Sequence, residues 1–137
     1  MISALDSSLI LDVLTANPRF VDSAEQLLRR ASAEGRLIMG ECVAAEILPA
    51  FRAKEELSDF LHDWQIDFVP SSLESSVLAG EHFARHLHRG GKAGRVLPDF
   101  LIGAHAFIHA DRLLARDRGC YRDYFAGLKV MGPGESR

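Results

Sequence analysis

The sequence has few cysteines and no long hydrophobic run, and both shortages narrow the classes of protein to which it can belong. Its two cysteines, Cys42 and Cys120, do not form a CxxC pair and are too few for a structural zinc site. We expect two packed, reduced thiols and a cytoplasmic location. No apolar run approaches the roughly 20 residues that cross a bilayer, and the first residues lack the pattern of a signal peptide. We therefore expect no insertion into a membrane.

The sequence also lacks an excess of charge of either sign. Its 16 lysines and arginines stand against 19 aspartates and glutamates, which gives a formal net charge of −3. Because a chain that binds nucleic acid through its overall charge is basic, contact with a phosphate backbone would have to come from a local cluster. The content of hydrophobic residues, 47%, is ordinary for a globular protein, and 137 residues suffice for one domain. We expect one domain over residues 1–131 and a C-terminal tail over 132–137.

Short apolar segments alternate with longer segments whose apolar residues recur at helical spacing. This alternation predicts an α/β fold with a central parallel sheet flanked by helices. The predicted strands cover residues 2–5, 37–39, 66–69, 113–115 and 128–131. The predicted helices cover residues 8–16, 18–34, 42–53 with a kink at Pro49, 57–64, 72–88, 98–110 and 121–125.

Four acidic residues are placed at or soon after the ends of the predicted strands. They are Asp6, directly after the first strand; Glu46, on the helix after the second; Asp99, in the first turn of the helix over 98–110; and Asp117, two residues after the fourth strand. Because the carboxyl ends of parallel strands meet at one edge of a sheet, we expect these side chains to converge. For Asp99 alone, simple stabilisation of a helix N-terminus is an equally good interpretation.

A cluster of carboxylates requires a neutralising cation, since the charges otherwise repel one another. Carboxylate oxygens suit Mg²⁺, with Mn²⁺ as an alternative. Such an ion lowers the pKa of water and stabilises the charge that develops on a phosphate under attack. The sequence therefore favours metal-dependent hydrolysis of a phosphodiester.

Five segments together resemble PIN-domain ribonucleases, and VapC-like toxins of type II toxin–antitoxin systems in particular. They are LDSSLILD at 5–12, VAAEI at 43–47, PDFLIGAHA at 98–106, LLARDRGCY at 113–121 and YFAGLKV at 124–130. No single segment is specific, but their order and spacing span residues 2–131. The resemblance implies a three-layer α/β/α fold, Mg²⁺-dependent endoribonuclease activity, a cognate antitoxin and a homodimer.

The resemblance also implies roles for particular residues. Asp6, Asp99 and Asp117 would bind the metal, Glu46 would join them in catalysis, and Ser7 would orient Asp6. The sequence departs from the family's pattern in two places. Ala115 stands where the family often has a serine or threonine. The pair Gly40–Glu41 stands where the family commonly has a serine. We expect one hydroxyl contact to be missing and the aim of Glu46 to be altered, with activity retained.

Basic residues near the predicted site are candidates for contact with RNA phosphates. Arg116 and Arg118 flank Asp117, and Lys92 and Arg95 lie in a glycine-rich segment at 89–95. The alternative is that they provide solubility and screen the acids.

Two alternatives remain. His82 and His86, like His105 and His109, are four residues apart, but the HExxH pattern of zinc hydrolases is absent. We expect a solvated face for the first pair and a packed His105. The second alternative concerns function, because the same fold can serve as a catalytically weak module that binds RNA or a protein.

Overall fold

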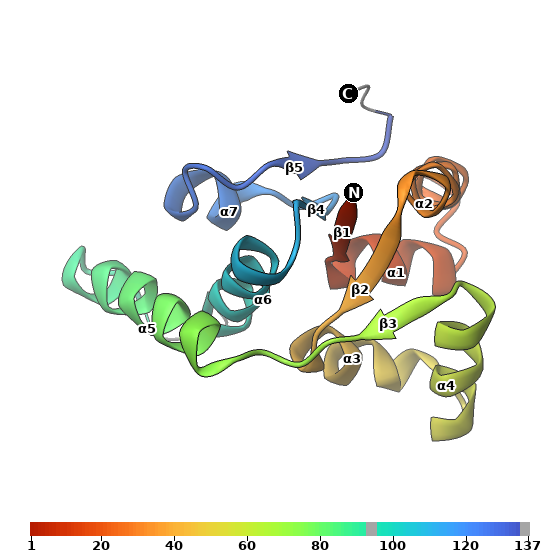
Figure 1. Cartoon of the computed structure of the whole chain (residues 1–137), viewed down its shortest axis with the longest axis horizontal. Helices are drawn as coiled ribbons and strands as arrows, with labels where there is room; N and C mark the ends of the chain where they lie inside the picture. The colour runs from red at the N-terminus through yellow and green to blue at the C-terminus, as the bar shows by residue number, and fades with distance from the viewer. Residues whose placement is uncertain (93–95, 135–137) are drawn as a thin grey trace.

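Five parallel strands form the centre of the molecule. The computed structural model describes residues 1–92 and 96–134, and Figure 1 traces the chain. The strands lie in the order β3-β2-β1-β4-β5, and every neighbouring pair is parallel, which confirms the predicted sheet. Their bounds are β1 (Ile2–Leu5), β2 (Arg36–Met39), β3 (Ile66–Phe68), β4 (Arg112–Leu114) and β5 (Val130–Met131).

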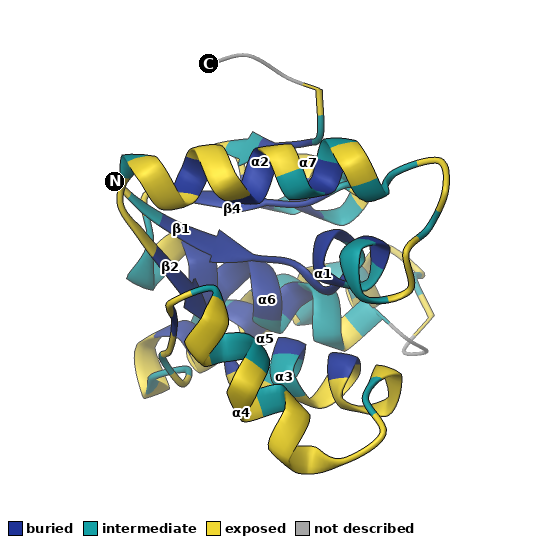
Figure 2. Cartoon of the chain, turned by 90° about the vertical axis from the view of Figure 1, so that its right-hand side faces the viewer, coloured by how far each residue is buried: buried dark blue, intermediate teal, exposed yellow. Residues whose placement is uncertain are grey.

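Helices cover both faces of this sheet, so the fold has the expected three layers. In Figure 2, α2 (Val21–Glu34) lies on one side of the strands, and α6 (Val96–His109) lies on the other. The three central strands are almost wholly buried, as parallel strands covered on both faces must be. The remaining helices are α1 (Ser7–Leu14), α3 (Glu41–Ile47), α4 (Lys54–Asp63), α5 (Leu73–His88) and α7 (Gly119–Tyr124).

The local sequence explains several helix boundaries, and the structure moves other predicted boundaries by a few residues. Ser72 and Ser75 form a capping box that begins α5, close to where the sequence predicted it. The predicted kinked helix over 42–53 instead ends at Ile47 and continues as a 3₁₀ turn, Leu48–Ala50. Pro49 explains this, because it has no N–H for a helical hydrogen bond. The predicted helix over 18–34 begins later, at Val21, and the one over 57–64 begins earlier, at Lys54.

A fully buried arginine ties the middle of the sheet to α2. The side chain of Arg112 on β4 is 0% exposed, and its Nη2 lies 2.7 Å from Glu34 Oε1 at the end of α2. Its Nε donates to Ser3 Oγ on β1 at 2.8 Å, and its Nη1 contacts Met131 Sδ on β5. One side chain therefore connects three strands and a helix.

Within the described residues, no helix is long and apolar enough to cross a bilayer. Of the predicted tail, residues 135–137 lie outside the described part of the chain, as does Arg95.

Candidate functional site

The site begins where β1 ends. Asp6 is the N-cap of α1, and its Oδ2 accepts a hydrogen bond from the backbone N–H of Ser8 at 3.0 Å. Aspartate favours this position because its carboxylate satisfies an N–H group that the first helical turn leaves unpaired. The backbone N–H of Asp6 donates to the carbonyl of Leu114 at 2.9 Å, which fixes it beside the end of β4. Capping and sheet pairing thus place this carboxylate at the carboxyl edge of the two central strands.

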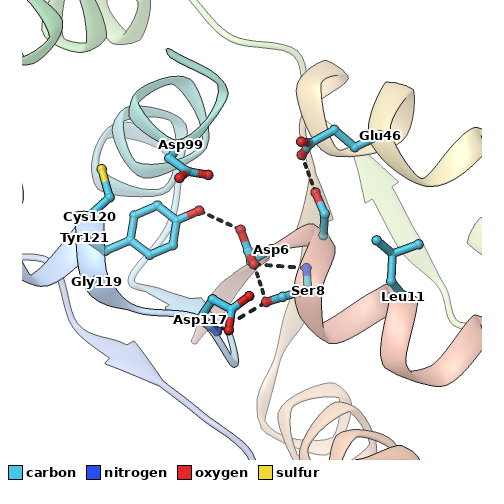
Figure 3. A pocket seen from close by; sticks show the side chains of 10 residues that line it. Asp6, Ser8, Leu11, Glu46, Asp99, Asp117, Gly119, Cys120 and Tyr121 are labelled. Carbon is cyan, nitrogen blue, oxygen red and sulfur yellow. Dashed lines mark hydrogen bonds between the residues drawn. The ribbon is translucent and has the colours of Figure 1, made fainter. Parts of the chain in front are cut away.

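The four predicted acids line one pocket at this edge. The pocket has a volume of about 270 Å³, and Figure 3 shows the side chains of Asp6, Glu46, Asp99 and Asp117 around it. They come from the start of α1, from α3, from the first turn of α6 and from the loop between β4 and α7. The remaining lining residues are Ser7, Ser8, Leu11, Gly119, Cys120 and Tyr121. Acids up to 111 positions apart in the chain are thus brought together.

Hydroxyl groups hold two of these carboxylates, but not in the predicted pairing. Ser7 was expected to orient Asp6; its hydroxyl instead donates to Glu46 Oε1, while the hydroxyl of Ser8 donates to Asp6 Oδ2. The capping geometry explains the difference, because the Asp6 carboxylate turns over the first helical turn toward Ser8. Ser7, on a different helix, therefore sets the orientation of the Glu46 side chain. The pair Gly40–Glu41 was expected to alter this orientation.

Tyr121 is a site residue that the sequence analysis did not identify. Its side chain is buried, and its hydroxyl donates to Asp6 Oδ1 at 2.5 Å. Burial, followed by the nearby charge of Asp6, raises the pKa of Tyr121 far above its ordinary value, so the phenol keeps its proton. Ala115 was expected to leave one hydroxyl contact missing at the site. Asp6 accepts hydrogen bonds from the hydroxyls of Ser8 and Tyr121. The only sequence signal was a tyrosine four residues after Asp117.

The guanidinium of Arg116 contacts other side chains of the protein. Its Nε lies 2.6 Å from Asp12 Oδ2, its Nη1 lies 3.2 Å from Asp117 Oδ1, and its guanidinium stacks 4.4 Å from the centre of the Phe20 ring. The hydrogen bond to Asp12 raises the pKa of Arg116. These contacts fix the loop that carries Asp117 against α1. Contact of Arg116 with RNA stays a prediction, as it does for Arg118 and for the exposed Lys92.

The two predicted histidine pairs pack against other side chains. His82 and His86 contact the rings of Tyr124, Phe125 and Phe100, so the predicted solvated face is wrong for both. The expected packing of His105 is confirmed, since it is buried with Nε2 2.6 Å from the carbonyl oxygen of Val69.

The crowding of negative charge has its clearest effect on Asp99. Burial contributes most, followed by Asp6, Glu46 and Asp117, and together they raise the pKa of Asp99 from its ordinary 3.8 to about 6. Near neutral pH the metal-free pocket therefore holds an ionised carboxylate at a cost to stability. A cation in the pocket would remove that cost.

We expect the cost to appear in the pH dependence of stability. Because the pKa of Asp99 in the folded state lies above its ordinary value, Asp99 stabilises the fold fully below about pH 3.8, and this stabilisation is lost as pH rises through about 6. The asparagine of an Asp99→Asn variant cannot ionise, so this variant does not lose stability as pH rises through about 6. In urea unfolding with chelator, the free energy of unfolding of the variant should increase relative to that of the wild type as pH rises. The difference should reach about 1–2 kcal/mol at neutral pH after allowance for solvent screening. A difference that does not change with pH would contradict this assignment.

The donor set fits a divalent cation of the magnesium type. All four acids offer hard oxygen ligands, and the charges of Asp6, Glu46 and Asp117 add to the effect of burial in raising the pKa of Asp99. In the part of the chain that the structure describes, no three acidic, histidine or cysteine side chains lie close enough to hold one ion together. Mg²⁺ usually keeps several of its waters and is bound through one or two carboxylates. Asp6 and Asp99 are the candidates for direct bonds, with Glu46 and Asp117 acting through water.

Comparison with known proteins identifies the fold. No protein-family model matches the sequence, and no curated protein matches it significantly. Solved structures do match. VapBC2 from Rickettsia felis, bound to a DNA fragment from their promoter, matches with a TM-score of 0.73 at 19% sequence identity. DNA-bound VapBC from Salmonella typhimurium matches with a TM-score of 0.72 at 12% sequence identity. Each match covers 96% of this chain and 98% of the other chain. FitAcB from Neisseria gonorrhoeae has 0.65 at 15%, covering 96% of each chain. The chain therefore has the PIN-like fold of VapC-type proteins, as the sequence resemblance predicted.

Proposed function

We propose that this protein is a Mg²⁺-dependent endoribonuclease and the toxin component of a toxin–antitoxin pair in the cytoplasm. The observation that carries the catalytic part is the convergence of four carboxylates from separate elements in one pocket, where burial and then the charges of the other three raise the pKa of Asp99. A purely structural role explains a single capping acid such as Asp6, but it does not explain four.

The protein's own residues would each do part of the work. Asp6 and Asp99 would bind the cation directly, and Asp117 would bind one of its waters. When bound, Mg²⁺ or Mn²⁺ supplies a more acidic water and neutralises the negative charge that develops on the phosphate. Glu46 lies across the pocket from Asp99 and is solvent-exposed, so it is our candidate for the general base. The hydroxyl of Ser7 would hold Glu46 in place for this role.

The toxin role is supported by the likeness of fold to chains from structures described as VapBC and FitAcB complexes. An antitoxin would place a basic side chain in the acidic pocket or lay a helix in a groove beside it. A homodimer is part of the same proposal. Mixing the purified chain with the product of a short adjacent reading frame, followed by size-exclusion chromatography, would test both.

The test of the catalytic part is RNA cleavage by the purified protein. We expect a broad panel of RNAs to include at least one that is cut with Mg²⁺ and is left intact when a chelator replaces it. An Asp6→Asn variant, purified in parallel, controls for a contaminating nuclease and should be inactive. RNA binding and metal binding without any cleavage would contradict an enzyme and favour a binding module of the same fold.

A further inference from the structure

We propose that Tyr121 is a positioning residue, whose phenolic hydroxyl sets the orientation of the Asp6 carboxylate for metal binding. This inference rests on the proposed function, because it assumes that Asp6 binds a divalent cation. It adds a residue from α7 that the sequence pattern did not assign to the site.

The hydrogen bonds around Asp6 show what Tyr121 contributes. Oδ2 of Asp6 accepts from the backbone N–H and the hydroxyl of Ser8, both on α1. Oδ1 accepts from Tyr121, which is 115 residues away in the chain. Donors on both oxygens fix the rotation of the carboxylate about its Cβ–Cγ bond, whereas the Ser8 contacts alone hold one end. Each carboxylate oxygen has two lone-pair positions, so Oδ1, which accepts a single hydrogen bond, keeps one for a bond to the metal.

The surroundings of Tyr121 make it a rigid support. Its side chain is 3% exposed and Asp6 is 5% exposed, so water has little access to the bond between them. Figure 3 shows the Tyr121 hydroxyl directed at Asp6, with the Asp99 carboxylate beside it. A buried carboxylate oxygen without a donor is unfavourable, and a fixed ligand loses less freedom when it binds a metal.

Tyr121 also connects two acids that would otherwise be fixed separately. It lies on α7, which follows directly after the loop that carries Asp117. The hydroxyl therefore pins the start of α7 to the end of β1, while Arg116 pins the preceding loop to Asp12. The relative placement of Asp6 and Asp117 depends on both contacts.

The experiment compares Mn²⁺ binding by wild type, Tyr121→Phe and Tyr124→Phe in calorimetric titrations without RNA. Tyr121→Phe keeps the buried ring and removes only the hydroxyl, and we expect it to bind Mn²⁺ about ten-fold more weakly, as is typical when a group that orients a ligand is lost. Tyr124→Phe is the matched control, because it makes the same chemical change on the same helix. The Tyr124 hydroxyl contacts His86 Nδ1 at 3.2 Å and not an acid, so its loss should leave the affinity unchanged.

A second readout separates positioning from general support of the fold. The chain has two tyrosines, so Tyr121 is the only one left in Tyr124→Phe. We expect the tyrosine absorption of this variant to shift when Mn²⁺ is added, because the metal withdraws charge from the carboxylate that the hydroxyl contacts. A tyrosine that merely packs would not respond.

The outcomes separate this inference from the function on which it rests. Equal Mn²⁺ affinity in wild type and Tyr121→Phe, with no change in tyrosine absorption, would overturn the role of Tyr121 and leave the metal site standing. Failure of the wild type to bind Mn²⁺ would overturn the proposed metal site and this inference with it.

Discussion

Replacement of Asp99 by asparagine is expected to lower the rate of RNA cleavage by on the order of a thousand-fold while making the metal-free protein more stable. The two effects have one cause. Asp99 is held ionised near Asp6, Glu46 and Asp117 although burial and these charges raise its pKa to about 6. Asparagine removes the repulsion, and with it the charge that would bind the cation. A loss of activity caused by misfolding would instead be accompanied by a loss of stability.

A matched control is available on the surface of α7. Asp123→Asn makes the same chemical change at an exposed position that does not line the acidic pocket. Its cleavage rate should equal that of the wild type, and its free energy of unfolding should change by no more than about 0.5 kcal/mol. Initial rates of cleavage of one RNA at saturating Mg²⁺, together with thermal unfolding in chelator, check both variants. Full activity in Asp99→Asn would contradict the proposed role of Asp99.

Replacement of Arg112 by alanine is expected to lower the free energy of unfolding by about 3–5 kcal/mol. The reason is that the substitution removes a fully buried guanidinium that donates to Ser3 and pairs with Glu34, which is itself only 16% exposed. It also leaves a cavity beside β1, the strand that ends at Asp6. Urea unfolding followed by circular dichroism measures the change.

Arg36 provides the control for Arg112, because it also forms an ion pair from a strand of the same sheet. Its Nε lies 3.0 Å from Asp67 Oδ2, but the two side chains are 57% and 55% exposed. Exposed pairs contribute little, so Arg36→Ala should cost less than about 1 kcal/mol. Similar losses in the free energy of unfolding for the two substitutions would show that burial is not what makes the Arg112 contacts stabilising.

Much of the site was predictable because it depends on the strand pattern. Asp6 directly follows β1 and Asp117 follows β4, and parallel pairing of these strands brings the two acids to one edge. Neither inference needs the angle of any helix. The sheet and its helices were predictable for the same reason, since apolar periodicity records burial directly.

The features that the sequence did not reveal depend on the packing of helices. The hydrogen bond from Tyr121 to Asp6 exists because α7 places one ring against the end of β1, and no local pattern specifies this. The pairing of Arg116 with Asp12 joins residues 104 positions apart. Ser7 and Ser8 are adjacent in sequence, and only the cap geometry decides which one serves Asp6.

The most direct test is a crystal structure of the protein grown with Mn²⁺, with data collected to locate the metal by its anomalous scattering. The account predicts an anomalous peak in the acidic pocket, bonded directly to the carboxylates of Asp6 and Asp99, with water between the ion and Asp117 or Glu46. Saturating Mn²⁺ with no peak in this pocket, or with a peak bound only by residues elsewhere in the molecule, would contradict it.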